Sequence, residues 1–105
     1  MAKEKEGGGQ TVIERAPKTA LKKPPLFKVL LHNDDFTPRD FVVIVLREVF
    51  NLGDGEAQAC MQHAHNHGIA VVGLFTFEIA ETKVNQAMAF AKEAQFPLKF
   101  TLESE

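Results

Sequence analysis

The sequence of 105 residues has no tryptophan and no tyrosine, and its single cysteine, Cys60, cannot form an internal disulfide. No signal peptide is evident, so we expect the chain to work in a reducing cytoplasm. No apolar run approaches the roughly 18 to 20 residues of a membrane span. The net charge of −2 also provides no basic field for binding nucleic acid. We therefore expect neither a membrane nor nucleic acid as a partner.

The first 24 residues differ in composition from the rest of the chain. The stretch "KEKEGGGQ" mixes charges with glycines, and "KTALKKPP" ends in two prolines. Neither stretch can bury enough apolar area to offset the entropy lost on ordering. We expect residues 1–24 to be a flexible extension and residues 25–105 to be one folded domain.

The remaining sequence alternates between strand-like and helix-like segments. Dense β-branched and large apolar residues indicate strands at 26–32, 69–75 and 96–102. Helices are expected after the N-caps Thr37, Asp54 and Thr76, ending near Phe50, Gly68 and Ala94. This order predicts an α/β domain of the α+β type: a two-layer β-α-α-β-α-β sandwich of three helices on a three-stranded antiparallel sheet.

Asn33, Asp34 and Asp35 place an amide and two acids where the first predicted strand ends. These residue types suit ordinary turns and helix N-termini. The two carboxylates are also pure acceptors that could surround a small cation such as an ammonium. Paired carboxylates can do acid–base chemistry, but no nucleophile, phosphate loop or cofactor fingerprint accompanies them. We therefore expect no enzymatic activity and no cofactor.

Three histidines, His63, His65 and His67, fall within five residues. The i, i+4 spacing of His63 and His67 could chelate a metal on a helix, but no Glu follows the first and no distant carboxylate is obvious. Solvated histidines at a helix end, with no metal, are the preferred interpretation. His65 lies at the edge of the apolar stripe that includes Met61 and Ala64, so it could either be a satisfied boundary residue or reach a polar site.

Four stretches, "HNDDFTPRDFV", "HAHNHG", "VGLFTFEIAETKV" and "FPLKFTLE", together resemble the ClpS family over residues 27–103. These are bacterial adaptor proteins that deliver N-degron substrates to a Clp AAA+ protease. The resemblance implies the same β-α-α-β-α-β order and a non-enzymatic function. The adaptor would bind the free α-amine and the large hydrophobic N-terminal residue (Phe, Leu, Tyr or Trp) of a substrate.

The resemblance also implies residue roles by position. Contacts to the substrate α-amine and first peptide unit are implied for Asn33, Asp34 and His65, and the site rim for Asp35, Thr37 and Arg39. The hydrophobic pocket would consist of Leu31, Val42, Met61, Ala64 and Leu98. Glu78 and Lys83 match the surface that meets the N-terminal domain of a ClpA-like unfoldase, and the N-terminal extension would assist substrate transfer. We expect the chain to act as a monomer.

The chemistry of a chain end explains such a residue set. An α-amine with a pKa of roughly 7.7 to 8.0 is mostly an ammonium at neutral pH and offers three donors. Asp34 and the Asn33 oxygen can accept two of these, and a neutral His65 or a backbone carbonyl can accept the third.

Two positions depart from the family pattern. Arg39 replaces the usual methionine, and Ala64 stands where a branched aliphatic residue is common, so β-branched side chains could enter the pocket.

The alternative function is a structural protein–protein interaction module with the topology of the ribosomal-stalk C-terminal domain. That domain has no reason to hold the amide and two acids of Asn33, Asp34 and Asp35.

Overall fold

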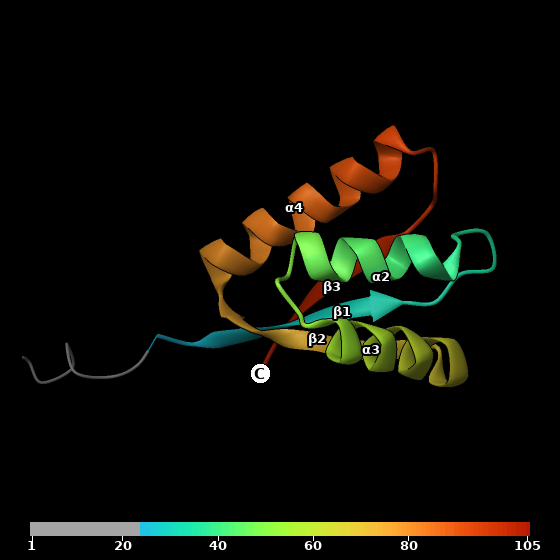
Figure 1. Cartoon of the computed structure of the whole chain (residues 1–105). Coiled ribbons are helices and arrows are strands. Elements are labelled where there is room, and N and C mark those ends of the chain that lie inside the picture. Colours follow the sequence, from blue (N-terminus) through green and yellow to red (C-terminus); the bar gives the residue numbers. More distant parts are fainter. Residues whose placement is uncertain (1–23) are drawn as a thin grey trace, which may run out of the picture.

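A computed structural model of the chain describes residues 24–105 (Figure 1). The predicted extension, residues 1–24, thus falls almost entirely outside the described residues. The described part contains six elements in the predicted order: β1 (Leu26–His32), α2 (Arg39–Glu48), α3 (Asp54–His67), β2 (Ile69–Thr76), α4 (Phe77–Glu93) and β3 (Lys99–Ser104). Within residues 24–105, no helix is both long and apolar enough to cross a membrane.

The sheet is antiparallel, with strand order β2-β1-β3 and β1 in the middle. Val29 and Leu31 of β1 are fully buried and face the helices, as alternation along a strand requires. Helices α2 and α4 lie over this face, and α3 packs against α2 and β2 (Figure 1). The predicted two-layer α+β fold is confirmed.

Two predicted helix starts are wrong by one residue. Helix α2 begins at Arg39 with Pro38 at the N-cap position, because Thr37 bonds to Asp34 instead of capping the helix. Helix α3 includes Asp54 as its first residue and begins after Gly53. The Glu56 carboxylate accepts a hydrogen bond from the Gly53 N–H at 3.0 Å. Glu56 thus closes the start of α3, whereas no side-chain hydrogen bond caps the start of α2.

Helix α3 ends as predicted at Gly68, whose φ of 90° lies in the left-handed region that favours glycine. Helix α4 starts after Thr76, also as predicted.

The third strand begins at Lys99 rather than at the predicted residue 96. Strand β1 ends at His32, which pairs with Lys99, so residues 96–98 have no strand partner. The Phe96 N–H instead donates to the Ala91 carbonyl oxygen at 2.9 Å and closes the end of α4. Leu98 is thereby left buried at the end of the sheet rather than paired within it.

An aromatic cluster fixes this loop against the start of α2. The Phe41 ring lies 4.8 Å from the Phe96 ring and 5.4 Å from the Phe90 ring, measured between centroids. Such pairs each contribute roughly 0.5–1.5 kcal/mol beyond the area they bury. The cluster holds Leu98 and the first turn of α2 at the same end of the domain, where β1 also ends.

Candidate functional site

Asp34 organises the loop between β1 and α2. Its Oδ1 accepts hydrogen bonds from the backbone N–H of Phe36 (2.8 Å) and of Thr37 (2.7 Å), and its Oδ2 accepts one from the Thr37 hydroxyl (2.9 Å). Aspartate favours this local pattern because its short carboxylate reaches N–H groups two and three residues ahead. The carboxylate is therefore held in one orientation.

This bonding leaves Asp34 with spare capacity. A carboxylate has about four acceptor positions, and three are used here, so one position on Oδ2 remains. Among residues 24–105, no lysine, arginine or histidine forms an ion pair with Asp34. The site thus retains an oriented negative charge that no described cation neutralises.

A backbone hydrogen bond joins the two halves of the site. The Asn33 N–H donates to the Gly68 carbonyl oxygen at 3.0 Å. Gly68 ends α3, and His65 lies in the last turn of that helix. This contact therefore brings Asn33 and Asp34 close to His65, although the two groups are more than 30 positions apart in the sequence.

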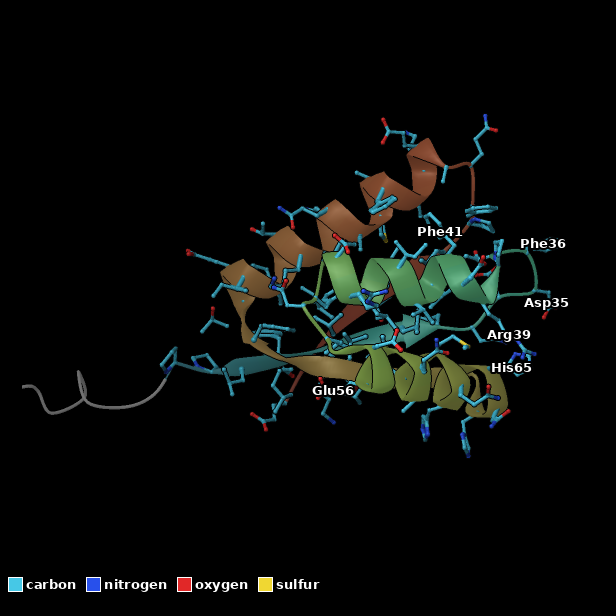
Figure 2. The ribbon with its side chains drawn as sticks, in the orientation of Figure 1. Asp35, Phe36, Arg39, Phe41, Glu56 and His65 are labelled. Carbon is cyan, nitrogen blue, oxygen red and sulfur yellow. The ribbon has the colours of Figure 1, made fainter. Side chains whose placement is uncertain are left out.

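Arg39 and His65 meet at the open end of the site (Figure 2). The Arg39 guanidinium nitrogen lies 2.6 Å from His65 Nε2. Arginine can only donate, so His65 Nε2 must accept. His65 Nε2 is therefore already engaged by Arg39.

A cavity of about 210 Å³ lies inside this rim. An apolar cavity of about 150 Å³ is enough to bind benzene, so there is room for one aromatic or large aliphatic side chain. All the residues predicted for the α-amine site, the rim and the pocket line this cavity: Leu31, Asn33, Asp34, Asp35, Thr37, Arg39, Val42, Met61, Ala64, His65 and Leu98. The polar members come from the loop 33–38, from the first residue of α2 and from α3, while the buried apolar ones form the floor.

One lining residue, His32, was missed by the sequence analysis. It is the last residue of β1, and alternation along the strand places it on the opposite face from Leu31. Its Nε2 lies 2.7 Å from the Thr101 hydroxyl on β3. The signal in the sequence was its position directly before Asn33, at the end of the strand.

The two residues predicted for the unfoldase interface lie on α4, outside the cavity lining. They belong to the first half of this helix, whose start lies at the opposite end of the domain from the loop that joins β1 to α2 (Figure 1). Glu78 is exposed there, between the exposed Phe77 and Ile79.

Lys83 is half-buried, and its ammonium donates to the Val49 carbonyl oxygen, 2.9 Å away. It also lies 5.9 Å from the Phe75 ring centroid. Lys83 thus has an internal partner at the C-terminus of α2.

Lys83→Met should destabilise the fold. The substitution keeps an apolar chain but removes a charged donor from a helix C-terminus, at a cost of roughly 1–2 kcal/mol. Chemical denaturation should show a lower free energy of unfolding, and Lys99→Met, which removes an exposed lysine, should show little change. Equal stability of Lys83→Met and the parent would mean that the contact to Val49 contributes nothing.

The outer histidines of the triplet interact with each other. The rings of His63 and His67 stack with centroids 4.2 Å apart, and His67 Nδ1 lies 3.2 Å from the His63 carbonyl oxygen. No group of three or more His, Cys, Asp or Glu side chains within the described residues is arranged to hold a metal ion.

Cys60 has no features of a nucleophile. Burial raises the pKa of its thiol above the ordinary value, which keeps it protonated at neutral pH. It is also absent from the cavity lining.

Comparison with known proteins is consistent with this geometry. The family model described as ATP-dependent Clp protease adaptor protein ClpS matches residues 22–101. The ClpS adapter protein of Parvibaculum lavamentivorans is 50% identical over 102 residues, which cover 97% of this chain and 93% of the relative. That of Myxococcus xanthus is 47% identical over 105 residues, covering 100% and 98%. The structure of Agrobacterium tumefaciens ClpS2 bound to L-phenylalaninamide matches with a TM-score of 0.76 and 48% identity, covering 79% of this chain and 100% of that one.

Proposed function

The chain belongs to the ClpS family of Clp protease adaptor proteins, and we propose from this premise that it binds the free N-terminus of proteins that begin with a large hydrophobic residue. It would act as a monomer in the cytoplasm and deliver these proteins to a Clp AAA+ unfoldase. An adaptor is not an enzyme, so the absence of catalysis expected from the sequence is confirmed by the family. The family also favours this function over the alternative of a ribosomal-stalk-like module.

One observation carries the proposal: the cavity combines an apolar floor with an oriented, unneutralised carboxylate at its rim. The free position on Asp34 Oδ2 and the side-chain oxygen of Asn33 can each accept one ammonium N–H. The first side chain of the substrate would then enter the cavity toward Leu31, Ala64 and Leu98. The relative whose structure contains L-phenylalaninamide binds a ligand with both of these parts, an amine and a benzyl group.

The expected affinity follows from these contacts. A hydrogen bond to a charged group contributes roughly 1.5–3 kcal/mol, and burial of a Phe or Leu side chain contributes roughly 1.5–3 kcal/mol. After the entropy of association is subtracted, micromolar or tighter binding is reasonable. An acetylated terminus loses the charge and two donors, so it should bind far more weakly.

The delivery step involves a surface other than the cavity. Glu78, Phe77 and Ile79 are exposed near the start of α4 and could contact the N-terminal domain of a ClpA-like unfoldase. This position leaves the mouth of the cavity free while the adaptor is docked. Lys83 would support the surface from beneath by joining α4 to the end of α2.

A peptide array that varies only the first residue tests the binding proposal. Peptides beginning with Phe, Leu, Tyr or Trp should bind with a free amine and lose at least roughly tenfold in affinity when acetylated. Peptides beginning with Ile or Val should also bind, because Ala64 leaves room for a β-branched side chain at the cavity wall. Peptides beginning with Ala or Glu are the controls. Equal binding of free and acetylated Phe peptides would overturn the proposal.

A further inference from the structure

We propose that Arg39 is a positioning residue for His65: its guanidinium keeps the His65 proton on Nδ1, so that His65 acts on a bound chain end as a hydrogen-bond donor. This inference rests on the proposed function, because it assigns His65 to the first peptide carbonyl of the substrate.

The tautomer follows from the chemistry of the contact. Arg39 is a permanent cation with only donors, and it lies 2.6 Å from His65 Nε2. A neutral imidazole has one N–H, so when Nε2 accepts, the proton must be on Nδ1. In water the Nε2–H tautomer of histidine is the more populated one, so this contact reverses the ordinary preference.

The distribution of acceptors and donors at the rim supports the assignment. Asp34 has one free acceptor position and Asn33 has a side-chain oxygen, so the rim can hold an ammonium without using His65. The carbonyl oxygen of the first substrate residue instead needs a donor. Within residues 24–105, no group accepts a hydrogen bond from His65 Nδ1, which leaves this donor available.

The contact also joins the two walls of the cavity. Arg39 is the first residue of α2, His65 lies in the last turn of α3, and both line the cavity at its open end (Figure 2). A side chain tied to the opposite wall loses rotational freedom before the ligand arrives. Because the side chain is already ordered, its lost freedom does not weaken the binding free energy of the ligand.

Nuclear magnetic resonance of the unliganded protein tests the tautomer. Two-bond ¹H–¹⁵N correlations at mildly alkaline pH, where imidazoles are neutral, should show the His65 proton on Nδ1 in the parent. Arg39→Met should move His65 toward the Nε2–H form, whereas Arg47→Met should not. Arg47 is a matched control because it is an exposed arginine on the same helix, outside the cavity lining. An Nε2–H tautomer in the parent overturns the inference.

A pair of ligands tests the donor role. L-phenylalaninamide and 2-phenylethylamine both have an ammonium and a benzyl group, but only the amide has the carbonyl. Arg39→Met should reduce the preference for the amide by roughly two- to tenfold, the range expected for one hydrogen bond between neutral groups. The ratio of the two affinities is informative because lost charge and altered packing at Arg39 act on both ligands.

A second substitution makes this result specific to His65. His65→Asn provides an amide N–H close to the position of Nδ1, and its orientation does not depend on a tautomer. In that background Arg39→Met should leave the ligand ratio unchanged. If Arg39→Met changes the ratio equally in both backgrounds, Arg39 acts directly and not through His65.

If neither ligand binds the parent protein, the proposed function fails and the donor role fails with it. If both bind and Arg39→Met leaves their ratio unchanged, only the positioning role fails.

Discussion

Asp34→Asn should weaken the binding of a Phe-initiated peptide by roughly 10- to 100-fold, the equivalent of one hydrogen bond to a charged group. The asparagine oxygen can still accept from the N–H groups of Phe36 and Thr37, and its amide nitrogen can donate to the Thr37 hydroxyl. The loop should therefore keep its shape while the site loses its charge. Fluorescence anisotropy with a labelled peptide measures the change.

The choice of asparagine rather than alanine follows from the three internal bonds. Asp34→Ala would leave those donors without their acceptor, so it should lower stability as well as affinity, and its binding defect would have two explanations. Asp40→Asn is the matched control, since it removes a nearby exposed carboxylate, on the first turn of α2 and outside the cavity lining. Unchanged affinity in Asp34→Asn would refute the ammonium-binding role.

Most of the fold could be predicted from the sequence because its signals are local. The apolar run of 26–32 and the glycine at 68 specify where β1 lies and where α3 ends, whatever the rest of the chain does. Where the prediction failed, a longer-range contact decided the outcome. β3 starts at Lys99 because its partner strand stops at His32, a fact that residues 96–98 do not contain.

The membership of the site was predictable for a different reason. Asn33, Asp34 and His65 were assigned together by resemblance, and the Asn33–Gly68 hydrogen bond gives the physical cause of their proximity. The contact between Arg39 and His65 was not predictable, because no local pattern links the start of one helix with the end of another. Nor did the sequence indicate that the Lys83 ammonium is bonded within the molecule.

Ala64→Leu should abolish the binding of Phe-initiated peptides while raising the stability of the fold. Ala64 is 2% exposed and lines the cavity, so a leucine there would project into the space proposed for the substrate side chain. Filling an apolar cavity commonly adds roughly 0.5–2 kcal/mol to the free energy of unfolding. For a domain of this size the melting temperature should rise by roughly 4–8 °C for each kcal/mol.

A loss of peptide binding together with a gain in stability would distinguish a binding cavity from an ordinary core position. Ala57 lies on the same helix, is fully buried and does not line the cavity. Ala57→Leu should therefore overpack the core and lower stability by roughly 1–3 kcal/mol. Thermal unfolding and peptide titration of both variants provide the comparison. If Ala64→Leu is destabilised like Ala57→Leu, or still binds Phe-initiated peptides with the parental affinity, the cavity is not an empty site that a substrate side chain occupies.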